Sequence, residues 1–379
     1  MDFDLTSEQK ILQETARKFA EKEIAPRINE METTGRTPRA LIERMRNLNF
    51  YGIQYPEMYG GTGASFIEYC LVMEEIARVY CSLGGHIAVN NLCAGTIYEF
   101  GTEEQREIYL PQLIRGDAVG SFAFTEPDTG SDPKAIKTTA VRDGNSWVIN
   151  GHKCFITNAT LAGYATVFCK DMEMDGAITC IIVPKFCEGY VVGEQYKKMG
   201  MHGMEVAEIF FENAHVPYDD TVGGEASRAL GFTMLTQQIA AGKLGISAQC
   251  VGMAQAALDE AVKYAKTRRQ RGRPISNFQT IQWIIGEMAA EVEAARYMTY
   301  AAAYAKSRGS DILVESARTR LFASQVAHRA ASNAMQVLGA YGYTKEFPVE
   351  RIFRDMKIAE IYEGVNEIQR VISASALLR

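Results

Sequence analysis

The sequence contains none of the short motifs that mark the commonest nucleotide-binding and catalytic sites. No GxGxxG follows a candidate strand, and no GxxxxGK(S/T), GxSxG or HExxH segment occurs. The five histidines are scattered, and the eight cysteines show no CxxC spacing. These absences disfavour a Rossmann domain, a P-loop, a serine hydrolase and a metal centre, so we expect no bound metal ion.

An excess of positive charge and long apolar runs are also missing. The net charge is −6, whereas a nucleic-acid surface needs clustered Lys and Arg. No run of about 18 apolar residues occurs, and the segment Met1–Gln9 lacks the basic and apolar stretches of a signal peptide. We therefore expect no nucleic-acid partner, no membrane insertion and a cytoplasmic location.

The composition is that of an ordinary folded protein. Apolar residues make up 47% and charged residues 23% of the 379 residues, which is enough chain for two or three domains with a large core. A chain of this size does not need disulfides to fold, so the cysteines are interpreted as buried free thiols.

The hydrophobic pattern changes twice along the chain and predicts the order helical, β, helical, an α+β fold. Thr6 to Gln9 form a capping box before a helical pattern, and Asp143-Gly144 is a turn between two β-prone runs. Helical spacing returns after Gly231. The predicted domains are an N-terminal helical domain (1–117), a middle β domain (118–222) and a C-terminal helical bundle (223–379).

Two polar loops in the middle region are candidates for ligand binding. The segment Phe122–Pro133 follows an apolar strand with hydroxyls, glycine and carboxylates, and the segment Gly151–Asn158 ends a strand with an aromatic, a hydroxyl and an amide. Taken alone, each is explained equally well by a solvated turn or by a core Phe beside a surface Thr.

The segment Ile361–Arg370 places the carboxylate of Glu363 beside Gly364, where a helix is expected to begin. A carboxylate on such an elbow can serve as a base. A surface carboxylate stabilised by the helix dipole would explain the same pattern.

Five ordered segments together resemble the acyl-CoA dehydrogenase family, in particular its short-chain, medium-chain and butyryl-CoA dehydrogenase-like members. They are Thr125–Asp132, Phe155–Asn158, Arg268–Gly272 with Phe278-Gln279, Gln336–Gly342 and Ile361–Gly364. The resemblance extends from Leu5 to the last helix. It implies an N-terminal helical domain, a β-barrel-like middle domain and a C-terminal four-helix bundle, assembled as a homotetramer that is a dimer of dimers.

The resemblance also implies FAD bound without a Rossmann motif. The flavin ring would contact Phe122, Phe124, Thr125, Ser131, Phe155, Ile156 and Thr157, with the two threonines as donors. The pyrophosphate and adenosine would meet Arg268, Gln279, Gln336, Val337, Gly339 and Ala340 of a neighbouring subunit, because an Arg fork can bind phosphate oxygens bidentately. Val365 and Glu367 complete the residues expected at the cofactor.

By the same resemblance, Glu363 is the base that removes the α proton of an acyl-CoA while a β hydride passes to flavin N5, giving a trans-2-enoyl-CoA. The Glu363 N–H and a ribityl hydroxyl would hold the thioester oxygen. Ser131, Lys243, Tyr362 and Gly364 are expected at the substrate. Some relatives carry the base on the helix that we expect to begin near Gly242, and no acid lies there.

Several positions depart from the family pattern and weaken the substrate detail. Ala240 and Lys243 stand where Asp and Arg are usual, and Arg271 replaces a Phe. Val365-Asn366 follows Glu-Gly in place of Thr-Ser, and His202–Met204 occupies a site where Arg and Ser are commoner. None of these positions is the base.

The direction of the reaction and the acyl group stay open. The chemistry also runs in reverse as an enoyl-CoA reductase, and in either direction the expected electron partner is an electron-transfer flavoprotein. An inactive flavin-binding scaffold is the alternative of another class, and an acyl-CoA oxidase would usually be longer. Asn90 or Asn91 in the segment Ile87–Leu92 could meet a polar or aromatic acyl group, and we expect a short or compact chain.

Overall fold

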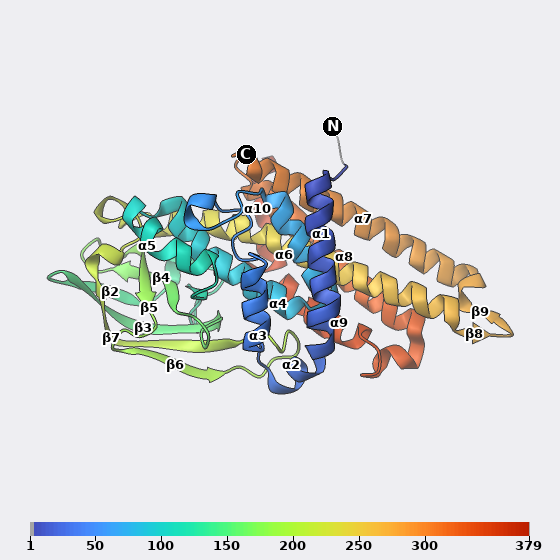
Figure 1. Ribbon diagram of the computed structural model, residues 1–379. Coiled ribbons are helices and arrows are strands. Elements are labelled where there is room, and N and C mark those ends of the chain that lie inside the picture. Colours follow the sequence, from blue (N-terminus) through green and yellow to red (C-terminus); the bar gives the residue numbers. More distant parts are fainter. Residues whose placement is uncertain (1–3, 379) are drawn as a thin grey trace.

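The N-terminal region is helical and is built around one long buried helix (Figure 1). A computed structural model describes residues 4–378 of the chain. The Thr6 side chain accepts from the Gln9 backbone N–H and the Gln9 side chain accepts from the Thr6 N–H, which confirms the predicted capping box. The helices of this region are α1 (Ser7–Phe19), α2 (Ile28–Thr34), α3 (Arg39–Asn47), α4 (Phe66–Phe100) and α5 (Glu103–Ile114).

Helix α4 is the central element of the molecule. Its residues are apolar on nearly every face because α1, α5, α6 and α7 all pack against it, as does strand β1. The helix is interrupted at Tyr80, whose φ of −155° and ψ of 104° are extended. The Tyr80 hydroxyl donates to Glu32 and accepts from the Gly203 N–H, so the interruption ties three segments together.

The middle region is a curled, mixed β-sheet at one end of the molecule (Figure 1). Its strand order is β1-β4-β2-β3-β7-β6, with β5 paired to β4. The predicted turn joins β2 to β3 through Gly144, whose φ is +58°. The strands are β1 (Gly120–Ala123), β2 (Thr139–Asp143), β3 (Ser146–Thr157), β4 (Tyr164–Asp171), β5 (Ala177–Pro184), β6 (Tyr190–Gln195) and β7 (Val206–Pro217).

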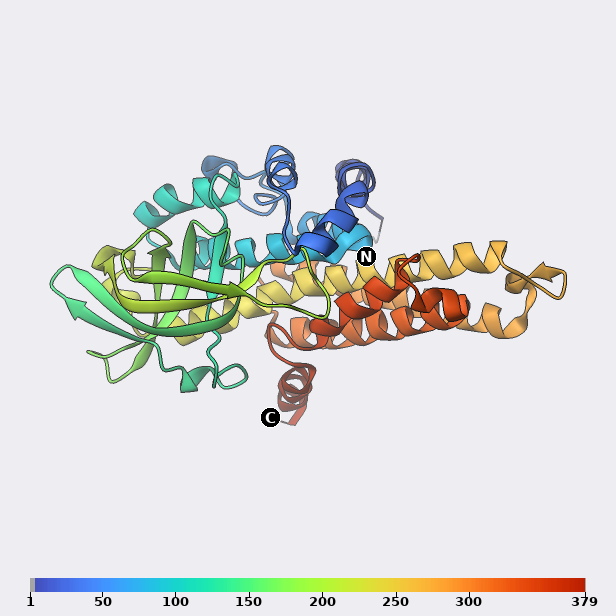
Figure 2. The same ribbon diagram turned by 90° about the horizontal axis from the view of Figure 1, so that it is seen from below.

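The C-terminal region is a bundle of three long helices crossed by shorter ones. Helix α9 packs on α8 and α6, and α10 packs on α8. A short hairpin caps the far end of the bundle (Figure 2). The elements are α6 (Gly231–Thr267), β8 (Arg269–Gln270), β9 (Arg273–Pro274), α7 (Gln279–Ser307), α8 (Leu313–Leu338), α9 (Val349–Met356) and α10 (Asn366–Leu378).

One helix boundary expected from the sequence is wrong. Gly242 does not lie near the start of a helix but eleven residues inside α6, which begins at Gly231. The glycines of α6 mark close approach rather than a boundary, since a Cβ at Gly252 would collide with the carbonyl oxygen of Glu74 in α4.

The described residues contain no helix that is both long enough and apolar enough to cross a membrane. All eight cysteines are free, and seven of them are buried. Within residues 4–378 no group of three His, Cys, Asp or Glu side chains is placed to hold a metal ion.

Candidate active site

Glu363 lies on a tight turn between α9 and α10. Its φ is +52° and that of Gly364 is +91°, so two consecutive residues adopt the left-handed region. A non-glycine residue in that region is strained, and such strain gathers at functional sites. The Gln369 side chain donates to the Gly364 carbonyl at 2.9 Å and fixes the turn from α10.

Arg320 of α8 also holds this turn in place. Its side chain is fully buried, with Nη1 donating to Asn366 Oδ1 at 3.0 Å and Nη2 to the Tyr362 carbonyl at 2.6 Å. Ser324 completes this network through the Asn366 amide. Arg320 could not be predicted from the sequence, because nothing local connects it to a turn more than 40 residues away.

One oxygen of the Glu363 carboxylate is buried without a partner in the described part of the chain. The residue as a whole is half-buried, but its Oε2 atom is shielded from solvent and makes no hydrogen bond within the described part of the chain. Burial raises the pKa of Glu363 to about 7, against the opposing pull of Arg320 and Lys243. This carboxyl can therefore exchange a proton near neutral pH.

Lys243 on α6 is the second cation near this carboxylate. It is buried, and burial together with repulsion from Arg320 lowers its pKa to about 8 while Glu363 opposes that shift. Two cations thus act on one carboxylate without forming an ion pair with it among the described residues. They favour its ionised form, whereas burial favours the neutral form.

Gly242 makes room for the base. A Cβ built at this position would collide with Glu363 Oε2 and would lie 2.9 Å from Leu92 Cδ2. The carboxylate therefore sits directly against the α6 backbone, a contact that only glycine allows.

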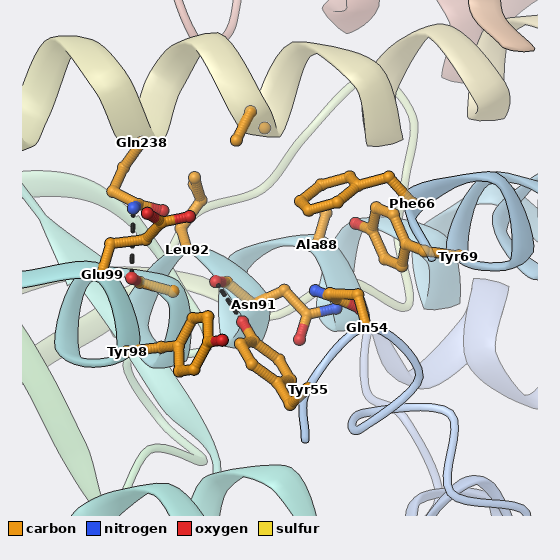
Figure 3. Close-up of a pocket in the computed structure, with 13 residues that line it drawn as sticks. Gln54, Tyr55, Phe66, Tyr69, Ala88, Asn91, Leu92, Tyr98, Glu99 and Gln238 are labelled. Atoms are coloured by element: carbon orange, nitrogen blue, oxygen red, sulfur yellow. Dashed lines mark hydrogen bonds between the residues drawn. The ribbon is translucent and has the colours of Figure 1, made fainter. Parts of the chain in front are cut away.

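A narrow cavity of about 40 Å³ leads from Gly242 between α4, α6 and the loop before α4 (Figure 3). Aromatic rings supply much of its wall, and amide side chains supply its polar part. The lining residues are Gln54, Tyr55, Phe66, Tyr69, Ala88, Asn91, Leu92, Gly95, Tyr98, Glu99, Gln238, Ala241 and Gly242.

The loop after β1 is shaped by a buried ion pair. Lys153 Nζ contacts Glu126 Oε1 at 2.8 Å and also donates to the carbonyls of Phe124 and Phe168. Phe124 is buried edge-on to Phe168, whereas Phe122 and Thr125 are half-buried and Ser131 is exposed. The loop is thus anchored at its start and open to solvent further along.

The end of β3 presents its residues in alternation. Phe155 has a φ of +55°, is 63% exposed and stacks on Tyr196 with ring centroids 4.6 Å apart. Ile156 is buried and Thr157 is half-buried. Asn158 ties the strand to α4, because its Oδ1 lies 2.8 Å from Nδ1 of His86.

The residues predicted to meet the adenosine part lie at the opposite tip of the molecule from the sheet (Figures 1 and 2). Arg268 is exposed, and its guanidinium lies 5.8 Å from the ring centroid of Tyr341. Gln279, Gln336, Gly339 and Ala340 are exposed as well, while Val337 is buried. One chain therefore does not bring its two predicted sets of flavin contacts together.

Both predicted sets nevertheless suit a flavin nucleotide. Thr125 and Thr157 are half-buried, and a threonine hydroxyl can donate to a ligand. The exposed fork of Arg268 suits a phosphate. Near the base, Tyr362 directs its hydroxyl to Gln249 Oε1 at 3.4 Å, Val365 is half-buried and Glu367 is exposed.

Comparison with known proteins finds matches along nearly the whole chain. Family models described as acyl-CoA dehydrogenase N-terminal, middle and C-terminal domains match residues 6–117, 121–214 and 230–378. The chain is 38% identical to an acryloyl-CoA reductase (NADH) of Anaerotignum propionicum, covering 100% of this chain and 96% of the relative.

Two solved structures are similar along their full length. The butyryl-CoA dehydrogenase from Megasphaera elsdenii has a TM-score of 0.97 at 36% identity, with 100% of both chains covered. A structure described as the electron transferring flavoprotein of Acidaminococcus fermentans contains a chain with a TM-score of 0.97 at 40% identity, again with 100% of both covered.

Proposed function

This chain belongs to the acyl-CoA dehydrogenase family, and we propose that Glu363 is the base with which it removes the α proton of an acyl-CoA to give a trans-2-enoyl-CoA. The enzymes of this family are FAD-dependent oxidoreductases that act on CH–CH groups. The observation that carries the proposal is the buried, unpartnered Oε2 of Glu363 on its strained turn.

Burial prepares Glu363 for this step. A thioester α proton is weakly acidic, and a carboxylate with a pKa of about 7 is a better base than one in water. Lys243 and Arg320 limit the rise in the pKa of Glu363 that burial causes. A substantial fraction of the carboxyl is therefore ionised at neutral pH. The strained turn keeps the oxygen in place, which spares the reaction the cost of orienting it.

The same turn offers a donor for the thioester oxygen. The Glu363 N–H has no acceptor among residues 4–378, and Arg320 fixes the preceding carbonyl. An N–H held in place can stabilise the negative charge that develops as the α proton leaves. Bound FAD supplies the acceptor for the β hydride. Tyr362 and Gly364, which flank the base, and Lys243, which is buried beside it, stay the proposed substrate contacts with Ser131.

We propose that FAD bridges two subunits. Phe122, Phe124, Thr125, Phe155, Ile156 and Thr157 would hold the ring in one chain, while Arg268, Gln279, Gln336, Val337, Gly339 and Ala340 would hold the adenosine part from another. The adenosine set flanks the hairpin at the far end of the bundle, whereas the ring set lies on β1, on the loop after it and at the end of β3 beside α4. This separation supports the division. Val365 and Glu367 remain proposed contacts. A homotetramer built as a dimer of dimers would supply the pairing.

The proposed electron partner is an electron-transfer flavoprotein. The Acidaminococcus fermentans structure, which is described as one, contains a chain of the same fold. The physiological reaction is either oxidation or the reverse reduction, and the acryloyl-CoA reductase relative supports the second direction. We place the enzyme in the cytoplasm and its substrate among short or compact acyl-CoAs, because four aromatic side chains stand among the residues that line the cavity.

Anaerobic titration of the purified protein tests the proposal. The wild type is expected to be yellow and to lose its flavin absorbance on addition of short acyl-CoAs, whereas Glu363→Gln is expected to stay yellow. A flavin that no acyl-CoA reduces, and that no enoyl-CoA reoxidises once reduced, would favour the scaffold alternative. A protein that binds no flavin would remove the proposal.

A further inference from the structure

The polar end of the cavity contains a buried amide, that of Asn91, which has no part in the proposed removal of the α proton. Asn91 is 7% exposed, and both its Oδ1 and Nδ2 atoms are buried without a hydrogen-bond partner among the described residues. The Tyr69 hydroxyl lies close to this amide, but the contact does not reach hydrogen-bond geometry. A buried amide with neither donor nor acceptor satisfied is costly, so a ligand that completes it is expected.

A second amide faces the same space. The Gln54 Oε1 atom is also buried and unpartnered, and Figure 3 shows the side chains of Asn91 and Gln54 pointing toward one another inside the cavity. The Tyr55 hydroxyl is already occupied by the Asn91 carbonyl at 3.1 Å, and Gln238 Nε2 by the Gly95 carbonyl at 3.1 Å. Among the described residues that line the cavity, the buried polar side-chain atoms without a partner therefore all belong to these two amides.

The position of the amides relates them to the acyl group. The cavity reaches Gly242, whose backbone touches Glu363, so an acyl chain with its α carbon at the base would extend along α4 toward Asn91. On the proposed function, on which this inference rests, the amides lie at the far end of the acyl group from the thioester.

The charges along the cavity wall limit which chemical groups the polar end of the cavity can bind. The residues that line the cavity include the carboxylate of Glu99 and no basic side chain. Lys306 lies outside the lining and is paired with Glu99 at 3.0 Å. A carboxylate on the acyl chain would meet no free cation, whereas a neutral group that both donates and accepts would satisfy a carboxamide.

We infer that Asn91, together with Gln54, selects an acyl-CoA whose short chain ends in a neutral group that both donates and accepts a hydrogen bond, a hydroxyl above all. A site built to bond a hydroxyl discriminates strongly against the analogue that lacks it, because its own polar groups are then left unpaired. A plain hydrocarbon tip would leave both amides unsatisfied.

Matched thioesters test this assignment, because a hydroxyl and a methyl group are similar in size. The pairs are 4-hydroxybutyryl-CoA with pentanoyl-CoA and 5-hydroxypentanoyl-CoA with hexanoyl-CoA. Binding is measured by calorimetry in a Glu363→Gln background, where no turnover consumes the ligand. The hydroxylated member of at least one pair is expected to bind about tenfold or more tightly.

Asn91→Leu in that background is expected to abolish or reverse the preference while leaving the apparent Tm unchanged or higher, since it removes an unsatisfied buried amide. Ser82→Ala is the matched control, because Ser82 Oγ is also buried and unpartnered on α4 but lies outside the cavity. It is expected to keep the preference of the parent.

Equal binding within both pairs, or a preference that survives Asn91→Leu, would overturn the inference. A lower Tm for Asn91→Leu without any change in preference would show a structural or water-binding role only. These outcomes are separate from a failure of the proposed function, which would appear as wild-type flavin that exchanges electrons with no thioester.

Discussion

Two buried carboxylates of this protein, Glu126 and Glu363, both lie on loops that follow regular elements, and they differ in what surrounds them. Glu126 accepts from Lys153 Nζ at 2.8 Å, from the Lys137 N–H at 2.5 Å and from the Thr138 N–H at 2.9 Å. Burial pushes its pKa up, but Lys153 and Thr138 outweigh burial and hold the pKa below its usual range.

Glu363 shows the opposite balance. Within residues 4–378 its Oε2 has no hydrogen-bond partner and its two neighbouring cations form no ion pair with it, and its pKa rises to about 7. The difference shows that burial alone does not decide what a carboxylate can do. A fully bonded carboxylate holds a loop in shape, whereas an unbonded one is free to take a proton.

The largest effect is expected from removing the proposed base. Glu363→Gln should lower the turnover rate by about 10³-fold, because an amide of nearly the same shape cannot accept the α proton. Stability should not fall at pH 8. A carboxyl with a raised folded-state pKa stabilises the protein below its unfolded pKa and loses that contribution as pH rises through about 7, so the neutral amide loses nothing there.

Steady-state kinetics and thermal unfolding measure the two quantities on one preparation. Turnover within tenfold of the wild type would contradict the assignment of the base.

Removing the cation that is paired with Glu126 should instead lower the stability of the protein. Lys153→Met leaves the buried charge of Glu126 without its cation and is expected to lower the free energy of unfolding by about 3–5 kcal/mol. Urea denaturation measures this change. Lys137→Met is the matched control, because Lys137 and Asp128 form an exposed pair that should contribute about 0–1 kcal/mol. Equal effects of the two variants would contradict the comparison.

Adding one carbon atom beside the base should cause a smaller loss of turnover. Gly242→Ala places a Cβ against Glu363 Oε2 and is expected to lower the turnover rate by about 10²-fold through displacement of the carboxylate. Gly286→Ala in α7 is the control, since nothing lies within 4 Å of its Cβ and alanine favours the helix by about 1 kcal/mol. Unchanged kinetics in Gly242→Ala would show that the base tolerates movement.

The smallest effect concerns pH. The rate with acyl-CoA should rise with pH through about 7 as Glu363 ionises. Lys243→Met removes a cation that lowers the pKa of Glu363, so the rising limb of the pH–rate profile should move to higher pH. Lys263→Met on the exposed side of α6 should leave the limb in place. A limb that moves to lower pH in Lys243→Met would contradict the electrostatic account.

Much of the fold is predictable because its signals are local. The capping box at Thr6 and the Asp143-Gly144 turn each involve residues within four positions, and both are present in the structure. Strand β6 has no comparable local signal, since its residues are only partly buried and it depends on pairing with β7. Gly242 was misplaced because a glycine required for contact between elements is indistinguishable, in sequence, from one at a helix end.

The candidate site likewise contains residues with a local sequence signal and residues that depend on long-range packing. Glu363 was predicted from a short motif, whereas Arg320 and the contact between Gly242 and the base depend on packing between helices that are far apart in the chain. The predicted flavin contacts at Thr125, Thr157 and Arg268 stay predictions, because one chain does not bring the half-buried threonines and the exposed arginine together.

The protonation state of Glu363 in the folded protein decides whether this carboxyl can take up a proton near neutral pH. Difference infrared spectra of wild type minus Glu363→Gln, recorded from pH 5 to 9, report the carbonyl band of the protonated carboxyl. A carboxyl with a pKa of about 7 is expected to give a band that disappears with a midpoint near pH 7. A carboxylate that is already fully ionised at pH 5 would contradict it.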